Sequence, residues 1–350
     1  MQASLERRLK WLLRLSLLGT LLTVLVILVG AWTRLVDAGL GCPDWPGCYG
    51  RLLVPDNDHA ALHHPDVPLD ASKAWVEMIH RYIATLLGIL VVSVLALGWP
   101  FRKHPQYPWF ISIALLASIL VQGAFGAFTV TLKLWPQVVT LHLLGGLSVL
   151  LLFLWLHLRI RGVAEQKLLN AQRLNIWWGM AVGLLIVQLA LGGWVTSNYA
   201  GIACQDIPTC NGQWWPAMDI SEGFHVTQTV GPNYLHGQLH AEARVAIHFI
   251  HRMGALLLGI ALLMLWYRHR RACHVAGPLG LVVAIYVFQA LLGMANVLMW
   301  LPLWLALLHT AGAVLLTVSL LWAWWRWRLS KEENYTAQAD LYSSHPPVPS

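Results

Sequence analysis

Charged residues are scarce in this sequence: acidic and basic side chains together make up only 11% of its 350 residues, whereas 57% are hydrophobic. Soluble domains carry about 25% charged residues, so this composition excludes a water-soluble globular protein. Scarce charge also leaves long apolar runs uninterrupted, and a run of about 20 residues is long enough to span a bilayer. The sequence therefore predicts an integral membrane protein.

Eight apolar runs have the length of a transmembrane helix. They lie near 11–32, 75–97, 109–130, 138–157, 176–196, 245–266, 279–299 and 302–325. The first run is too long, and too poor in small residues at its end, to be a cleaved signal peptide. The predicted fold class is all-α integral membrane, with eight transmembrane helices.

Basic residues gather on one side of the predicted membrane. Lys and Arg cluster at the amino terminus, at 102–103, at 159–173, at 268–271 and after 326. Cytoplasmic segments carry such an excess, so we expect both termini in the cytoplasm and a multi-pass protein of the bacterial inner membrane. The basic excess follows from this topology and needs no nucleic-acid partner.

Cysteine is also rare, and four of the five cysteines fall in two long segments on the opposite, outer side, as CPDWPGC at 42–48 and CQDIPTC at 204–210. That side faces an oxidising compartment, so we expect the disulfides Cys42–Cys48 and Cys204–Cys210. Two cysteine pairs also suggest a quinone-linked thiol oxidase. Five intervening residues that include prolines favour structural disulfides over a reactive pair.

The chain contains an internal repeat. VGAWTRLVDAGLGCPDWPGC at 29–48 aligns with LGGWVTSNYAGIACQDIPTC at 191–210, and VQGAFGAFTV at 121–130 aligns with FQALLGMANV at 288–297. Four helices per repeat return the chain to its starting side, so we predict two tandem four-helix bundles related by a pseudo-twofold axis along the membrane normal. The expected organisation is a cytoplasmic amino terminus at 1–10, a first half at 11–160, a cytoplasmic linker at 161–175, a second half at 176–328 and a disordered cytoplasmic tail at 329–350.

Four histidines occupy matched positions inside the predicted helices: His80 and His142 in the first half, His251 and His309 in the second. Each lies about four to six residues past the outer end of its predicted span, hence at a similar depth. Two imidazoles facing each other across a bundle have the arrangement of axial haem ligands. Small residues follow on the same helix faces, where a flat porphyrin needs room: Ala84, Gly145, Gly146, Gly254, Ala255, Gly312 and Ala313.

Other roles are open to these residues. A single buried histidine can hydrogen-bond a neighbouring helix, and a zinc site would need three or four ligands together. Matched pairs kept in both halves favour two haem-binding halves, each with a bis-histidine site. Arg81 and Arg252 follow two of the histidines and are candidates to pair with haem propionates, or to extend toward lipid headgroups.

One position distinguishes the two halves. Glu77 precedes His80 by three residues on the same helix face, whereas His248 occupies the corresponding position before His251. A carboxylate there could complement the positive end of the helix dipole, or it could accept or relay a proton. The difference indicates that the halves have divided their roles.

Together, GAWTRLVDAGLGCPDWPGC, EMIHR, TLHLLGG, HFIHRMG and LLHTAG resemble the haem A synthase family of cytochrome oxidase assembly proteins, over about residues 15–325. The resemblance implies an oxidoreductase that converts a methyl group of haem O into a formyl group, through a hydroxymethyl intermediate, to make haem A for terminal oxidases. It implies haem b as cofactor between His251 and His309, the substrate haem between His80 and His142, and Glu77 as the catalytic carboxylate.

The resemblance also implies partners: haem O as substrate, and haem O synthase and oxidase assembly factors. Contact with membrane lipid and a homo-oligomer are further expectations. A non-catalytic dihaem b-type cytochrome is the alternative function, in which the same four histidines serve electron transfer and Glu77 only caps a helix. A secondary transporter is disfavoured, because the helix midsections are neither charged nor broken.

Overall fold

The computed structural model describes residues 2–104, 107–164 and 175–343, in which all regular elements are helical. Eight of these helices are long and apolar enough to cross a membrane, which confirms the predicted fold class. They are α1 Gln2–Leu35, α3 Ala71–Gly98, α4 Trp109–Thr131, α5 Pro136–Ala164, α6 Ile176–Ser197, α8 Ala241–His269, α9 Cys273–Leu298 and α10 Leu303–Ser343. The shorter elements are α2 Asn57–His63, η1 Trp99–Phe101 and α7 Ile220–Gly223.

Two helices begin four residues before their predicted apolar runs. The Asp70 carboxylate caps α3 by accepting a hydrogen bond from the Lys73 N–H at 3.1 Å, so the helix starts at Ala71. Helix α8 starts at Ala241 and carries Glu242 in its first turn, where a negative charge complements the helix dipole. These polar first turns extend the helices beyond what hydropathy alone predicts.

The earlier helix starts change the placement of two histidines. His80 follows the start of α3 by nine residues and His251 follows the start of α8 by ten. The expectation of four to six residues is therefore wrong for this pair, because the predicted spans omitted the capped turns. His142 and His309 each follow the start of their helix by six residues, as expected.

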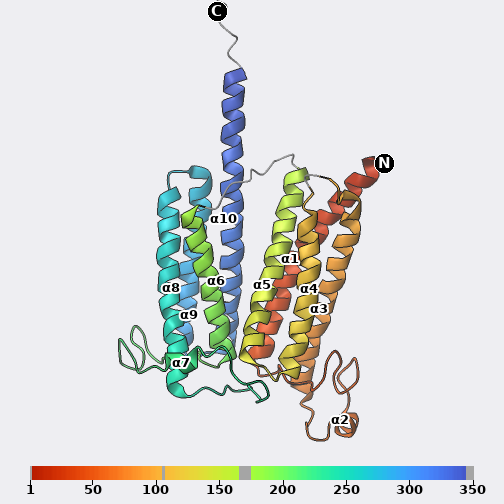
Figure 1. Cartoon of the computed structure of the whole chain (residues 1–350), viewed down its shortest axis with the longest axis vertical. Helices are drawn as coiled ribbons and strands as arrows, with labels where there is room; N and C mark the ends of the chain where they lie inside the picture. Colours follow the sequence, from red (N-terminus) through yellow and green to blue (C-terminus); the bar gives the residue numbers. More distant parts are fainter. Residues whose placement is uncertain (1, 105–106, 165–174, 344–350) are drawn as a thin grey trace, which may run out of the picture.

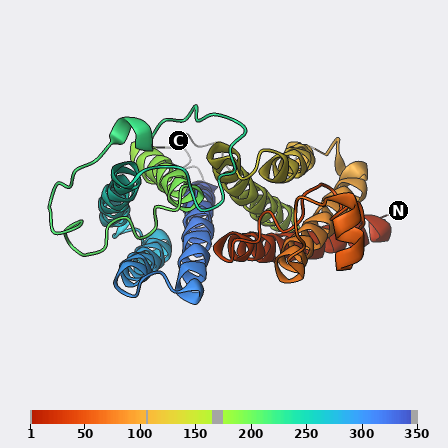
Figure 2. The same cartoon turned by 90° about the horizontal axis from the view of Figure 1, so that it is seen from below.

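The long helices gather in two groups that lie side by side. Helix α1 packs against α3 and α5, and α4 packs against α3 and α5; α6 packs against α8, and α9 packs against α8 and α10. Contacts between α5 and α6 and between α1 and α10 join the groups (Figures 1 and 2). A pseudo-twofold relation between the groups stays a prediction.

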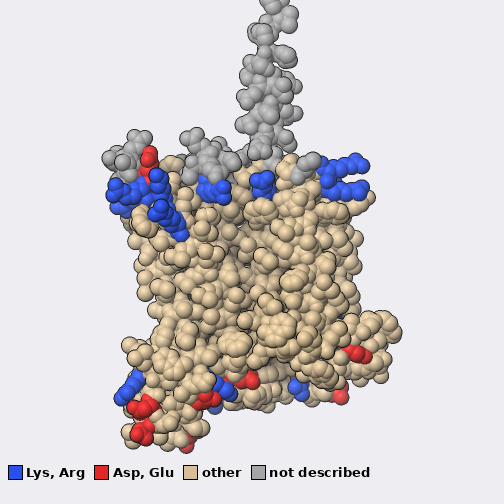
Figure 3. Space-filling view, turned by 180° about the vertical axis from the view of Figure 1, so that it is seen from behind, with Lys and Arg blue, Asp and Glu red and all other residues tan. Residues whose placement is uncertain are grey.

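Both long loops, at 36–70 and 198–240, lie at one end of the helices, here named the disulfide face (Figure 1). Lys and Arg concentrate at the opposite end, and most acidic residues in view lie at the disulfide face (Figure 3). The predicted linker lies mostly outside the described residues, and α10 runs on to Ser343, into the segment predicted as a tail. The domain boundaries stay predictions.

Candidate functional site

Both predicted disulfides are present at the disulfide face, Cys42–Cys48 and Cys204–Cys210. A tight turn follows each disulfide ring, at 48–51 and at 210–213, and contains a glycine at positive φ, Gly50 at 76° and Gly212 at 78°. Glycine adopts this conformation without the steric cost that a side chain would add. The disulfide loops are thus locally fixed structures in both halves.

An aspartate inside each disulfide ring binds the backbone of the turn that follows. The Asp44 carboxylate accepts hydrogen bonds from the N–H groups of Tyr49 and Gly50, both at 2.7 Å. Asp206 accepts from the Thr209 hydroxyl and from the Gly212 N–H, also at 2.7 Å. These bonds lower the pKa of Asp206 below its ordinary value, because they stabilise the ionised carboxylate, and the bond from Thr209 has the largest effect.

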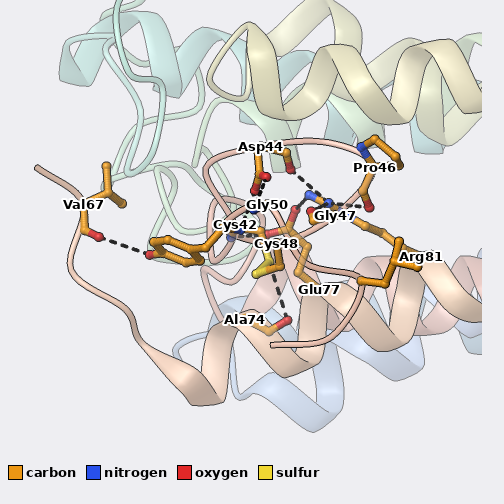
Figure 4. Close-up of a disulfide and its surroundings, with 12 residues drawn as sticks. Cys42, Asp44, Pro46, Gly47, Cys48, Gly50, Val67, Ala74, Glu77 and Arg81 are labelled. Carbon is orange, nitrogen blue, oxygen red and sulfur yellow. Dashed lines mark hydrogen bonds and ion pairs between the residues drawn. A yellow bond between two sulfur atoms is a disulfide. The ribbon is translucent and has the colours of Figure 1, made fainter. Parts of the chain in front are cut away.

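Glu77 connects the first disulfide loop to helix α3 (Figure 4). Its side chain is almost fully buried. One carboxylate oxygen accepts a hydrogen bond from the Cys42 N–H at 3.0 Å, and the other pairs with the Arg81 guanidinium one turn along the helix. The carboxylate therefore lies between the loop backbone and a cation, on the helix that carries His80.

His248 makes the corresponding connection in the second half. Its Nδ1 atom accepts a hydrogen bond from the Cys204 N–H at 3.3 Å, and the side chain is buried. A histidine and a glutamate thus anchor equivalent loops through equivalent backbone groups. Because loop anchoring is common to both, the feature left unique to Glu77 is its carboxylate, which can carry a charge or hold a proton.

The two arginines also hold the disulfide loops. Arg81 donates to the backbone oxygens of Asp44 at 3.0 Å, of Pro46 at 3.2 Å and of Gly47. Arg252 donates to the corresponding loop, at the backbone oxygens Asp206 O (2.9 Å), Thr209 O (2.9 Å) and Cys204 O (3.0 Å). Pairing of either guanidinium with haem propionates stays a prediction.

Each histidine of a helix has the other histidine of its half as an electrostatic neighbour, His142 for His80 and His309 for His251. Ligation of one haem by each pair stays a prediction. Three of the rings bury an Nδ1 atom that has no hydrogen-bond partner among the described residues, namely those of His80, His142 and His309. Buried polar atoms are normally satisfied, so each of these rings keeps a hydrogen-bonding atom that the described residues do not use.

A glycine of a neighbouring helix lies beside each ring, and two of these glycines make room for the ring. A Cβ at Gly30 would lie 2.8 Å from Cε1 of His80, and one at Gly293 would lie 3.0 Å from Cε1 of His309. The corresponding distances are 3.4 Å for Gly192 with His251 and 3.7 Å for Gly126 with His142. Paired imidazoles on two helices of one group, α3 with α5 and α8 with α10, each flanked by a glycine, fit bis-histidine ligation of haem iron.

Sequence reasoning missed three glutamines near these histidines. Gln122, Gln188 and Gln289 each pack the side-chain amide against a glycine that follows a histidine by three residues. A signal for two of them was present, because Gln122 and Gln289 align in the internal repeat. Polar side chains inside membrane helices are costly and are often functional.

Residues 13–321 match the family described as cytochrome oxidase assembly protein. The chain belongs to this family. Proteins named Heme A synthase are similar over most of their length: that of Shewanella oneidensis is 43% identical, over 89% of this chain and 94% of the relative. That of Rhizorhabdus wittichii is 30% identical, over 88% and 91%, and that of Symbiobacterium thermophilum is 31% identical, over 75% and 76%. These matches confirm the family resemblance.

Proposed function

We propose that this membrane protein is a haem A synthase, an oxidoreductase that converts a methyl group of haem O into the formyl group of haem A through a hydroxymethyl intermediate. The observation that carries the proposal is the membership of the chain in this family, with Heme A synthase relatives matched along almost the whole sequence. The buried histidine pairs supply haem-ligating chemistry in the same protein.

The substrate haem is proposed to bind between His80 and His142 in the first half. Glu77 lies on the same helix face as His80, buried and held by the Cys42 N–H and Arg81. Oxidation of a methyl carbon releases protons, and a buried carboxylate can accept or relay them. The hydrogen bonds that Glu77 already makes would hold it in one orientation while it does so.

A resident haem b is proposed to be held by His251 and His309. When bound, it would supply one-electron redox chemistry. The second half carries His248 in place of a carboxylate at the loop-anchoring position, which suits a site that binds a cofactor and moves no substrate proton. Arg81 and Arg252 remain the proposed partners of the propionates, on the helices that carry His80 and His251.

The charge distribution supports a cytoplasmic location of both termini, with the disulfide face in the oxidising compartment outside the bacterial inner membrane. Substrate haem O would be supplied by a haem O synthase, and haem A would pass to oxidase assembly factors. We propose that lipid surrounds the apolar helices and that the chain forms a homo-oligomer.

The test is expression of the full chain with a source of haem O, followed by extraction and chromatographic separation of the haems. Haem A and its hydroxymethyl precursor are expected. Haem-loaded protein that yields neither product would overturn the proposal and favour an electron-transfer cytochrome. His251→Ala is expected to remove the resident haem b. His225→Ala changes an exposed loop histidine and serves as the control, in which the absorbance of haem b should persist.

A further inference from the structure

An exposed apolar pair follows each disulfide ring. Leu52 and Leu53 come after the first ring, with 75% and 61% of each residue exposed, and Trp214 and Trp215 come after the second, with 74% of each exposed. The alignment of the two rings places these pairs at the same positions of both halves. Single exposed apolar residues are ordinary on a protein surface, whereas adjacent pairs at equivalent points of both halves indicate a surface that contacts an apolar partner.

The first pair is held beside a membrane helix. The Tyr82 hydroxyl of α3 donates a hydrogen bond to the Leu52 backbone oxygen. Tyr82 follows the start of α3 by eleven residues, which is about 16 Å along the helix axis. Its side chain points back toward the start of the helix but is shorter than this distance. The Leu52 backbone therefore lies alongside α3 and not beyond its end.

Tyr82 belongs to an exposed apolar face of α3. The large apolar residues exposed on this helix recur every three or four positions, which places them on one face: Trp75, Ile79, Tyr82, Leu86, Ile89 and Val92. Helix α3 is long and apolar enough to cross a membrane, where lipid surrounds such a face. The hydrogen bond from Tyr82 thus places Leu52 and Leu53 next to lipid-facing residues.

The second pair also lies beside its helix. The rings of Trp215 and Phe249 meet edge to face, with 5.4 Å between their centres. Phe249 follows the start of α8 by eight residues, about 12 Å along the axis. Farther along, α8 exposes large apolar residues, among them Met253, Leu256 and Leu257. The apolar pair of each half therefore continues the exposed apolar surface of a membrane helix.

We propose that these pairs are membrane contacts: Leu52–Leu53 and Trp214–Trp215 insert into the phospholipid leaflet at the disulfide face and hold both disulfide loops on it. Leucine partitions into the acyl-chain region, and tryptophan favours the level of the headgroups. Helices α3 and α8 lie at opposite flanks of the molecule (Figures 1 and 2). A single protein partner would have to reach both flanks, whereas lipid surrounds the whole bundle.

The first test uses the full chain without substitution, in phospholipid nanodiscs, with Leu62 as an internal control. Leu62 belongs to the same long loop and is 82% exposed, but its helix α2 lies beyond the ends of the long helices (Figure 1). Hydroxyl radicals oxidise side chains that water reaches. Oxidation of Leu52, measured by mass spectrometry, should be several-fold lower than that of Leu62. Equal oxidation of the two leucines would overturn the inference.

A nitroxide spin label identifies what covers the pairs. It is attached at Leu53→Cys or Trp215→Cys in a Cys273→Ser background, with Leu62→Cys as the matched control and with the native disulfides checked by mass spectrometry. The first two labels should collide more often with oxygen, which concentrates among acyl chains, than with a water-soluble nickel chelate, and the control label should show the reverse.

Nickel collisions as frequent at the first two labels as at the control would overturn the inference. Shielding from both oxygen and nickel would also overturn it, because it would indicate that a second copy of the chain or another protein covers the pairs. Neither measurement depends on haem or its conversion, so a failure here leaves the proposed function standing.

Discussion

At the scale of single residues, Glu77 and His248 show how one backbone contact can be made by two different side chains. Each accepts a hydrogen bond from the N–H of the first cysteine of its disulfide loop. Exchange of one residue for the other should therefore preserve the loop contact and change only the charge and the proton chemistry. Histidine is therefore a structurally matched substitution at Glu77, and glutamate is one at His248.

Glu77→His is expected to retain haem binding and to lower the conversion of haem O by about 10²-fold or more, the range attributed to a lost proton-transfer group. The measurement is haem A formed per bound haem, compared with the wild type. His248→Glu is the matched control and should leave conversion near the wild-type level. Equal conversion by Glu77→His and the wild type would show that the carboxylate serves only to hold the loop.

At the scale of elements, each disulfide loop is fastened to the helix behind it by an arginine as well as by its covalent bond. Arg252 alone donates to three backbone oxygens of the second loop. Hydrogen bonds from a charged donor contribute about 1.5–3 kcal/mol each, and such bonds remain when a disulfide is removed. The loops should therefore keep their path without the sulfur–sulfur bond.

Replacement of Cys42 and Cys48 by serine is expected to lower the stability of the first loop by about 2 kcal/mol, since the closed ring is short. Haem A production should persist if the disulfide is structural. Hydrogen exchange of the loop measures the first effect, and haem extraction measures the second. Loss of product in protein with native exchange elsewhere and normal haem content would instead assign the cysteines a redox role.

Asp206 gives the second loop a dependence on pH. Its pKa in the folded protein lies below the ordinary value, so its ionised form stabilises the loop at pH values above about 4. That stabilisation is lost as the pH falls through the depressed pKa and the carboxylate is protonated. Protection of the Gly212 amide from hydrogen exchange, corrected for intrinsic rates, should fall in that range.

Asp206→Asn should lower the protection of the Gly212 amide at neutral pH and remove its dependence on acid. Asp66→Asn, a change at an exposed aspartate of the other long loop, is the control and should leave that protection unchanged. Identical pH profiles in the wild type and Asp206→Asn would show that another group controls the loop.

At the scale of the whole molecule, the two halves meet at a polar cluster on the disulfide face. The Tyr199 hydroxyl donates to the Asp37 carboxylate at 2.9 Å, and the Arg34 guanidinium lies 3.7 Å from the centre of the Tyr199 ring. Arg34 also donates to the backbone oxygen of Thr196 at 2.7 Å. Burial raises the pKa of the Tyr199 phenol, so it remains a hydrogen-bond donor at neutral pH.

Tyr199→Phe is expected to destabilise the folded protein by about 1 kcal/mol, because it removes one hydrogen bond between the halves and keeps the ring under Arg34. Thermal unfolding in detergent, followed by helix content, measures the change. Tyr267→Phe alters an exposed tyrosine of α8 and should leave the unfolding temperature unchanged. Equal unfolding temperatures for Tyr199→Phe and the wild type would show that the cluster does not contribute to stability.

A loop of the second half also covers part of the first. The indole N–H of Trp135 donates to the Gln228 backbone oxygen at 3.1 Å, and the Tyr234 N–H donates to the Lys133 backbone oxygen at 3.0 Å. This segment crosses to the end of α4 and α5 in the view from below (Figure 2). The alignment of the halves gave no indication of the crossing, because it depends on the path of an irregular loop.

The eight spans and both disulfides could be predicted from the residues alone. Hydropathy is a sum over a local window, so a run of apolar residues defines a membrane helix wherever its neighbours lie. The contacts of Glu77 with Cys42, of the two arginines with the loops and of Gln188 with His251 required the folded chain. Each joins segments far apart in sequence, and such contacts depend on how each helix is rotated and where each loop runs.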